Sequence, residues 1–377
     1  MTNTALLKIY PELNVGDDLF LSILLNRYRN IDFFLLANRN MYKKFSNENE
    51  NLKIIDTIKN VNLLDRLILR LSRNFPVSVQ KKIYKFYIRK QYGESLINSE
   101  FFVTIGGSMF IENKNDEINR NLLFYQLIND VFKNKPKFFI GCNFGPYYSN
   151  KFLEDFKSVF KEASDLSFRE HESKTILNLP ELRVNPDIVF GFRNLSKLQK
   201  IKNSIGFVLV DPKLKMPNEI VNYTEYIKNL NQLMVYYDEI GYKIYLFSYC
   251  KRENDEELIN DVLNLGGLNN ANVIKYDGAL NSFINEYSKM ETVFCGRFHS
   301  MILSMLFGQM ILPVIYSKKM TNILGDIRFS GDIVQLKDLN ANDPDKYLQI
   351  AKNNRYDIDL LKSQADSHFE KIDQLIK

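Results

Sequence analysis

Residues 292–307 read TVFCGRFHSMILSMLF. The first four residues are β-branched, aromatic or apolar, as in a buried strand, and Met301–Phe307 favours a helix. Gly296 lies between them, followed by two side chains that can carry positive charge, Arg297 and His299. A strand that passes through a glycine turn into a helix is the repeating unit of a parallel α/β sheet.

The same alternation of strand, turn and helix runs through most of the chain. It predicts right-handed βαβ units and parallel sheets that are covered on both faces. The first series of expected strands is Leu6–Tyr10, Phe33–Ala37, Lys53–Asp56, Phe101–Ile105, Phe138–Cys142 and Leu166–Arg169. The second series is Gly206–Val210, Lys243–Tyr249, Asn272–Tyr276, Thr292–Cys295 and Ile311–Tyr316. We therefore expect two doubly wound, Rossmann-like α/β domains that face each other across a cleft.

The length of 377 residues suits two domains, each with its own core. With 45% hydrophobic and 25% charged residues, the composition is that of a globular protein. The weakly patterned stretch Gly191–Asn203 is the expected linker. This predicts an N-terminal domain over residues 1–192, a C-terminal domain over 203–342, and helices over 343–377 that pack back.

The cysteines Cys142, Cys250 and Cys295 lie far apart without CxxC spacing, which indicates neither a disulfide framework nor a zinc site. The chain contains no HExxH, HxH or GxSxG motif, so we expect neither a metal nor a serine hydrolase. No signal-peptide pattern is visible at residues 1–14, and polar residues, glycine and proline interrupt the longest apolar stretch, Met301–Ile315. These features predict a cytoplasmic protein without a membrane span.

Glycine-rich or polar turns follow several expected strands, where doubly wound proteins place their sites. Asn14-Val15-Gly16-Asp17-Asp18 precedes a helix that either aspartate can cap. Gly106-Gly107-Ser108 permits close approach of the backbone to a ligand. In Gly141–Tyr147, Asn143 stands between Gly141 and Gly145 and can present an amide to a hydroxyl-rich ligand. Each of these turns can equally be structural only.

Other turns carry cations. Arg169 ends a short strand, and its planar guanidinium suits a carboxylate or phosphate, although a salt bridge to Glu170 or another carboxylate would also explain it. Arg297 and His299 stand at the N-terminus of a helix, an arrangement that can hold a multiply charged anion. Two further cations follow the last expected strand, at Lys318 and Lys319.

In order and spacing, these turns resemble the polysaccharide pyruvyl transferase family. The matching pieces are Asn14-x-Gly16-Asp17, Gly106-Gly107-Ser108-x-Phe110, Gly141 to Pro146, Ser167-x-Arg169-Glu170-x-x-Ser173, Pro186-Asp187-x-x-Phe190, Arg297-Phe298-His299 and Tyr316-x-x-Lys319. The chain departs from the pattern at Gln309-Met310, where many relatives have a Gly/Pro-type turn. The resemblance implies a fold like that of the two-domain GT-B glycosyltransferases.

It also implies an enzyme that moves the pyruvyl unit of phosphoenolpyruvate onto two hydroxyls of a sugar, forming a cyclic ketal and releasing phosphate, without metal or cofactor. The expected acceptor is a galactose-type residue on a lipid-linked precursor of a capsular, extracellular or cell-wall polysaccharide. Two alternatives are a nucleotide-sugar-dependent glycosyltransferase of the same architecture and a non-catalytic glycan-binding protein.

In the family, the arginine and histidine that match Arg169 and His299 contact phosphoenolpyruvate. We expect His299 to protonate its methylene carbon and Arg169 to stabilise the departing phosphate. The base for the sugar hydroxyls is open among Asp17, Asp187 and Glu170. The other expected substrate-binding residues are Asn14, Gly16, Gly107, Ser108, Asn143, Gly145, Arg297, Ser300, Lys318 and Lys319.

The net charge of +5 is concentrated in one segment. Residues 59–93 hold nine basic residues and one acidic residue, Asp65, so this segment carries +8 and the rest of the chain −3. Its pattern predicts two helices hinged at Asn74-Phe75-Pro76, each with a cationic stripe beside an apolar one. Such helices can lie on an anionic membrane, or their apolar faces can pack on the domain. We expect peripheral docking at the inner membrane face and no nucleic-acid partner, although basic residues with interleaved tyrosines also suit single-stranded RNA.

Overall fold

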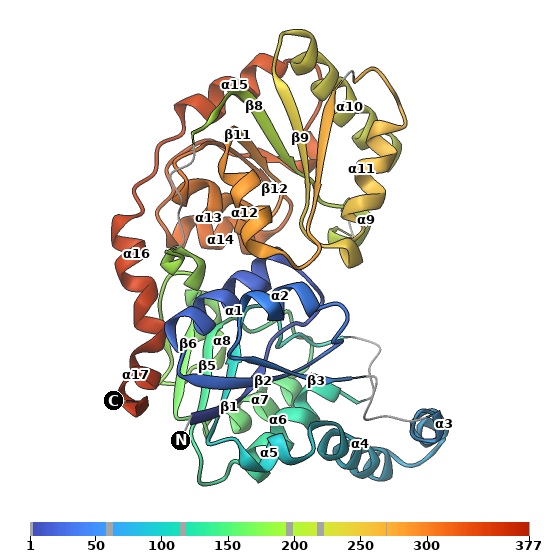
Figure 1. Ribbon diagram of the computed structural model, residues 1–377, viewed down its shortest axis with the longest axis vertical. Coiled ribbons are helices and arrows are strands. Elements are labelled where there is room, and N and C mark those ends of the chain that lie inside the picture. Colours follow the sequence, from blue (N-terminus) through green and yellow to red (C-terminus); the bar gives the residue numbers. More distant parts are fainter. Residues whose placement is uncertain are drawn as a thin grey trace. The chain divides into compact units, whose positions relative to one another are not determined.

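The computed structural model describes residues 3–57, 63–113, 118–193, 199–216, 222–268 and 270–376 (Figure 1). Contacts divide the chain into two units. Unit 1 comprises Met1–Pro11, Phe20–Ile188 and Gln364–Lys377, and unit 2 comprises Glu12–Leu19 and Val189–Ser363. This division by contacts does not test the domain boundaries expected from the sequence, which remain predictions. Residues 194–198 of the expected linker lie outside the described part.

Unit 1 is built on a parallel sheet in the order β3-β2-β1-β4-β5-β6-β7. Its strands are β1 (Asn3–Lys8), β2 (Ile31–Ala37), β3 (Leu52–Asp56), β4 (Phe101–Ile105), β5 (Lys137–Cys142), β6 (Asp165–Phe168) and β7 (Arg183–Val184). Strands β4, β5 and β6 are buried along their whole length, as central strands of a covered parallel sheet are. The sequence predicts all of these strands except β7, whose two residues are too few for a pattern.

Helices connect these strands as the alternating pattern predicts. They are α1 (Val15–Arg27), α2 (Lys43–Glu48), α3 (Leu63–Leu71), α4 (Val77–Tyr92), α5 (Glu94–Asn98), α6 (Arg120–Val131), α7 (Asn150–Phe160) and α8 (His171–Leu177). The first residues of α1 group with unit 2 and the rest with unit 1. The two helices expected in the basic segment are confirmed as α3 and α4, separated by the 3-10 turn η1 (Ser72–Asn74) and Pro76.

Unit 2 holds a second parallel sheet in the order β10-β9-β8-β11-β12-β13. Its strands are β8 (Ile201–Val208), β9 (Lys243–Ser248), β10 (Ala271–Lys275), β11 (Met290–Cys295), β12 (Met310–Ile315) and β13 (Val334–Gln335). The helices around it are α9 (Pro212–Lys215), α10 (Tyr223–Glu239), α11 (Asp255–Leu263), α12 (Leu280–Ser288), α13 (Phe298–Leu306), α14 (Lys318–Asp326) and α15 (Pro344–Asn353). Counted from its first strand, this sheet follows the doubly wound order 3-2-1-4-5-6, and the sheet of unit 1 follows the same order with a seventh strand added, so the expected fold class is confirmed.

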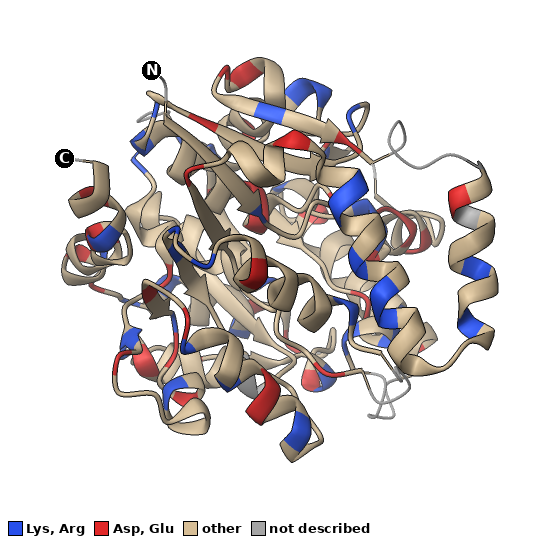
Figure 2. Ribbon diagram, turned by 90° about the horizontal axis from the view of Figure 1, so that it is seen from below, with Lys and Arg blue, Asp and Glu red and all other residues tan. Residues whose placement is uncertain are grey.

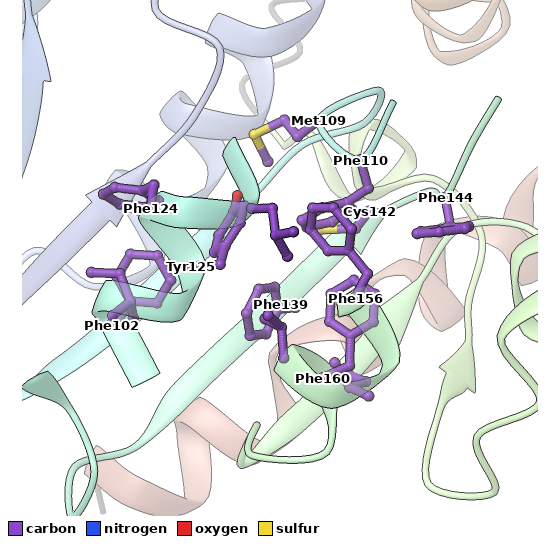
Figure 3. Close-up of a cluster of buried hydrophobic side chains, with 14 of the residues drawn as sticks. Phe102, Met109, Phe110, Phe124, Tyr125, Phe139, Cys142, Phe144, Phe156 and Phe160 are labelled. Carbon is purple, nitrogen blue, oxygen red and sulfur yellow. The ribbon is translucent and has the colours of Figure 1, made fainter. Parts of the chain in front are cut away.

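An aromatic core in unit 1 anchors two of the candidate turns (Figure 3). Phe110, two residues after Ser108, is buried with its ring centroid 5.0 Å from that of Phe160. Phe144, next to Asn143, is buried 5.6 Å from Phe152. Because these rings are fixed in the core, the polar residues beside them are held at the carboxyl edge of the sheet.

The chain ends on unit 1. Helix α16 (Asp359–Ala365) is followed by the 3-10 turn η5 (Asp366–Phe369) and by α17 (Glu370–Ile376). Asp373 accepts two hydrogen bonds from the guanidinium of Arg27 and one from the Tyr28 hydroxyl. None of the helices in the described ranges combines the length and apolar composition that crossing a membrane requires.

Candidate active site

In unit 1, Arg169 is the centre of a buried polar cluster at the carboxyl ends of β4, β5 and β6. Its Nη1 donates to Asp187 Oδ2 at 2.8 Å and its Nη2 to Asn143 Oδ1 at 3.0 Å. The amide oxygen of Asn143 also accepts the backbone N–H of Ser108 at 2.7 Å. Four residues predicted from separate turns therefore form one hydrogen-bonded cluster, in which the cation's carboxylate partner is Asp187.

Gly107 is required by this cluster. A Cβ atom at Gly107 would overlap the Arg169 guanidinium and lie 2.8 Å from Asn143 Oδ1. Any larger residue would therefore push the guanidinium out of its place. Gly145 serves the same loop differently: its φ of +98° favours glycine, and its N–H donates to the carbonyl oxygen of Phe110 at 2.8 Å.

Glu170 contributes a buried carboxylate beside Arg169. Its Oε1 accepts the hydroxyl of Ser173 at 2.6 Å, and that hydroxyl in turn accepts the N–H of Phe144 at 2.8 Å. Among the described residues, Oε2 of Glu170 has no hydrogen-bond partner although the residue is 3% exposed. An unsatisfied buried oxygen of this kind is costly, and such groups are common where a ligand completes the bonding.

His368 braces this cluster from the C-terminal segment, and sequence reasoning missed it. Its Nδ1 accepts the hydroxyl of Ser167 at 2.8 Å and its Nε2 donates to the carbonyl oxygen of Pro186 at 2.8 Å. These partners stand two residues before Arg169 and one before Asp187. Burial lowers the pKa of His368 to about 4, which keeps the ring neutral near pH 7. A lone histidine in a polar helical tail gives no sequence signal for this contact.

In unit 2, the first turn of α1 lies against the first turn of α13. A Cβ at Gly16 would overlap the imidazole of His299, so only glycine fits there. Asn14 Oδ1 accepts the N–H of Gly16 at 2.9 Å. Asn14 is therefore one residue that bonds the start of this helix. Asp18 is buried and accepts the Tyr276 hydroxyl at 2.6 Å, while Asp17 is partly exposed in the same turn.

Arg297, next to His299 in sequence, is buried between two carboxylates. Its guanidinium donates to Glu253 and to Asp255, and Lys215 Nζ lies 2.8 Å from Glu253. Burial acts to raise the pKa of Glu253, but the attraction of Arg297 and Lys215 prevails and lowers it to about 2. Burial raises the pKa of Asp255 against the opposing attraction of Arg297. Whether Arg297 also binds substrate remains a prediction.

The carboxylate partners of Arg297 were not predicted. Asp255 is fixed by accepting the N–H groups of Tyr249 and Cys250 at 2.8 and 2.9 Å, directly after β9. The signal available in the sequence is the acidic run from Glu253 to Glu257 after an expected strand, which helix capping also explains.

The remaining expected residues lie as follows. Ser300 is buried, and its hydroxyl donates to the carbonyl oxygen of Arg297 within the first turn of α13. Lys318 and Lys319 begin α14, and their side chains lie outside the described part of the chain. Arg169 and His299 belong to different units, so their contact with one donor stays a prediction. Across the described residues, no group of three or more His, Cys, Asp or Glu side chains is arranged to hold a metal ion.

A sequence model of the polysaccharide pyruvyl transferase family matches residues 14–317, which include the candidate turns from Asn14 to Ser300. No curated protein matches the chain at a significant level.

Several solved structures share its fold. UDP-GlcNAc 2-epimerase from Methanocaldococcus jannaschii has a TM-score of 0.61 at 12% identity, covering 100% of this chain and 99% of that one. The Neisseria meningitidis UDP-GlcNAc 2-epimerase bound to UDP-GlcNAc has a TM-score of 0.59 at 10% identity, covering 100% of both chains. HepE from Anabaena, in complex with UDP and glucose, has a TM-score of 0.54 at 12% identity, covering 100% and 98%. At such identities the likeness shows the fold alone, two parallel-sheet α/β domains of the GT-B type.

Proposed function

Because the chain belongs to the polysaccharide pyruvyl transferase family, we propose that it transfers the pyruvyl unit of phosphoenolpyruvate to two hydroxyls of a saccharide and releases phosphate. The observation that carries this proposal is the Arg169 cluster. There a buried guanidinium is held in place by Asn143 and Asp187 over a glycine. A cation that is fixed before the ligand arrives stabilises developing negative charge without reorganising, which is the main electrostatic contribution to catalysis.

The proposed reaction balances as follows. His299 gives a proton to C3 of phosphoenolpyruvate, and one acceptor hydroxyl adds to C2 as its proton passes to a base. The C2–O bond to phosphate then breaks, with Arg169 stabilising the departing charge. The second hydroxyl adds to C2 and its proton passes to the departed phosphate, which closes the cyclic ketal. The C2–C3 double bond, the C2–O bond to phosphate and two O–H bonds are consumed, and a methyl group, two C–O bonds and protonated phosphate result.

Among the three candidate bases, we propose Glu170. Asp187 is already engaged in a 2.8 Å ion pair with Arg169. Glu170 has one buried oxygen that makes no hydrogen bond to the described residues. Glu170→Gln should lower turnover about 10²-fold while leaving the KM for phosphoenolpyruvate nearly unchanged. An equal or larger loss of turnover in Asp17→Asn alone would transfer the role of base to Asp17.

We also propose that the basic segment docks on an anionic membrane. Leu64, Leu67 and Leu71 of α3 are 62%, 51% and 54% exposed, whereas Tyr87 and Ile88 of α4 are buried. These exposed leucines of α3 support docking, whereas the buried residues of α4 are taken up by packing. Lys and Arg also gather on the ribbons of these two helices, at the right of Figure 2.

Vesicle sedimentation tests this docking. Binding to anionic vesicles should weaken in Lys81→Gln/Lys82→Gln, on α4, and persist in Lys43→Gln/Lys44→Gln, an equally exposed lysine pair on α2. Equal binding by both variants would rule out an electrostatic role for the segment.

Phosphate release tests the proposed reaction itself. Phosphoenolpyruvate is incubated with a panel of galactosides, glucosides and mannosides, both free and lipid-linked, and phosphate is measured. We expect release that depends on one acceptor and that is lost in His299→Ala. The matched control is His171→Ala, an exposed histidine on α8. Release of UDP from a nucleotide sugar, with no consumption of phosphoenolpyruvate, would overturn the proposal in favour of a glycosyltransferase.

A further inference from the structure

Unit 1 contains a large polar cavity at the carboxyl edge of its sheet. The cavity measures about 920 Å³ and is bordered by Lys8 at the end of β1, by Ser108 after β4, and by Asn121 of α6. Arg73 of η1 and Arg120 of α6 border it too. This volume is at the upper end of the range for sites that bind small molecules. Because the N–H of Ser108 bonds the Asn143 amide that holds Arg169, the cavity begins beside the candidate active site.

The charges around this cavity are of one sign. Lys8, Arg73 and Arg120 are among its lining residues, and no aspartate or glutamate is among those that the structure describes there. Burial lowers the pKa of Lys8 to about 8, so most of its amines are protonated at pH 7. The Arg120 guanidinium lies 5.6 Å from the centroid of the Tyr84 ring. Cations that converge without nearby carboxylates favour an anionic ligand.

A second cavity, apolar in character, adjoins the first. It measures about 880 Å³ and is bordered by Leu64, Leu67 and Leu69 of α3. Its other lining residues are Arg70, Arg73, Tyr84 and Arg120. Leu69, Arg73, Tyr84 and Arg120 border both cavities, so the two are contiguous.

The arginines therefore stand where the polar cavity meets the apolar one. Arg70, Arg73 and Arg120 are exposed, and none forms an ion pair with the residues that the structure describes. In the apolar cavity beyond these arginines, Leu64 and Leu67 of α3 expose apolar surface to water, and a hydrocarbon chain that covered it would be stabilised there. The order along the two cavities is thus polar cavity, cation cluster and apolar groove.

We propose that these two cavities form one binding site for an amphiphilic acceptor, a saccharide joined through a diphosphate to a long apolar chain. The saccharide occupies the polar cavity beside Ser108, the diphosphate contacts Arg73 and Arg120, and the chain lies along Leu64 and Leu67. The identification of this ligand as the acceptor rests on the proposed function, whereas its binding does not.

Calorimetry on the full chain tests the site without phosphoenolpyruvate. The probe is farnesyl diphosphate. It is compared with inorganic diphosphate, which has the anionic group without the apolar chain, and with farnesol, which has the apolar chain without the diphosphate. We expect farnesyl diphosphate to bind at least tenfold more tightly than either of these two compounds. Equal affinity for farnesyl diphosphate and inorganic diphosphate would overturn the apolar groove, and equal affinity for farnesol would overturn the cation cluster.

Two double variants test where the apolar chain of the ligand binds. Leu64→Ser/Leu67→Ser changes exposed residues that line the groove and should weaken binding of farnesyl diphosphate at least tenfold. Leu71→Ser/Phe75→Ser changes residues that are 54% and 50% exposed but do not line it, and should leave the affinity unchanged. Equal loss in both variants would mean unspecific adsorption to an apolar surface and would overturn the proposal. Thermal melting confirms that both variants are folded.

Turnover separates this inference from the proposed function. If farnesyl diphosphate binds as expected but no acceptor releases phosphate from phosphoenolpyruvate, the site stands and the proposed reaction fails. If free and lipid-linked saccharides are turned over with the same kcat/KM and farnesyl diphosphate does not bind, the reaction stands and the site fails. A kcat/KM at least tenfold higher for the lipid-linked acceptor, lost in Leu64→Ser/Leu67→Ser, would support both.

Discussion

Arg169 and Arg297 are two buried arginines in similar positions that differ in their hydrogen-bond partners. Each follows a central strand and stands next to the start of a helix, and each is buried. Arg297 gives both terminal nitrogens to carboxylates, whereas Arg169 gives one to a carboxylate and the other to a neutral amide. Arg169 therefore contacts a neutral amide where Arg297 contacts a second carboxylate. We infer that Arg169 serves an anionic ligand and that Arg297 mainly positions the turn that carries His299.

The largest expected effect is that of Arg169→Gln. Removing the charge should lower kcat for phosphate release by about 10²–10³-fold, since a preorganised electrostatic contact is lost. It also leaves Asp187 buried without its cation, which costs about 3–5 kcal/mol of stability. Urea unfolding and phosphate release, measured on the same preparation, distinguish the two losses. Recovery of near-normal kcat in the folded fraction would show that Arg169 is structural, like Arg297.

Arg297→Gln should affect stability rather than chemistry. Leaving Asp255 buried without its cation, while Glu253 keeps Lys215, costs about 3–5 kcal/mol of the free energy of unfolding. The KM for phosphoenolpyruvate of the folded fraction should change less than threefold, because the charge was already balanced. A much larger rise in KM at unchanged stability would reverse the roles of the two arginines.

His368 should make unit 1 sensitive to acid. Its pKa is about 4 in the folded protein, below the ordinary value of 6.5, so the unfolded chain binds the extra proton between these pH values. This contribution is fully present above pH 6.5, is lost as pH falls towards 4, and amounts to about 3 kcal/mol.

His368→Gln should remove that part of the pH dependence, as measured by urea unfolding at pH 7 and pH 4.5. His171→Gln, on the surface of the same unit, is the matched control and should retain it. If the free energy of unfolding of His368→Gln changed with pH as much as that of the unchanged protein, the imidazole would not be the source of the pH dependence.

The smallest effect is expected from Gly16→Ala. One methyl group displaces the imidazole of His299 without removing any charge. We expect about a tenfold loss of kcat, with the melting temperature nearly unchanged, because a misplaced acid remains an acid. Gly107→Ala, which displaces Arg169 in the same way, is the corresponding variant in unit 1. A loss in one glycine variant and not in the other would show which of the two cationic groups acts in the rate-limiting step.

The sequence predicts the architecture well because apolar periodicity reports burial. The bounds expected for β4 are those observed, and those for β11 differ only at its start, by two residues. The strands β7 and β13 have two residues each, too few for a pattern. Residue chemistry likewise indicates that Arg169 and Asn143 suit polar ligands.

Contacts between residues that are far apart along the chain could not be predicted from the sequence. The partners of Arg297 stand more than 40 residues before it, and His368 is nearly 200 residues from Arg169. Whether a helical apolar face is covered is equally a tertiary property. Helices α3 and α4 each carry an apolar stripe beside a cationic one, yet Tyr87 and Ile88 of α4 are buried whereas Leu64 and Leu67 of α3 are exposed.

The division of unit 1 along the chain has a consequence for its synthesis. The unit includes Phe20–Ile188 and then nothing until Gln364, about 175 residues later. At translation rates of about 5–20 residues per second, the ribosome needs roughly 10–35 s to cover that interval. Throughout it, Ser167 and Pro186 lack the imidazole that bonds them in the finished protein. Residues 20–188 therefore exist for a time as an incomplete unit, open to chaperones and proteases, until the segment that carries His368 has been made.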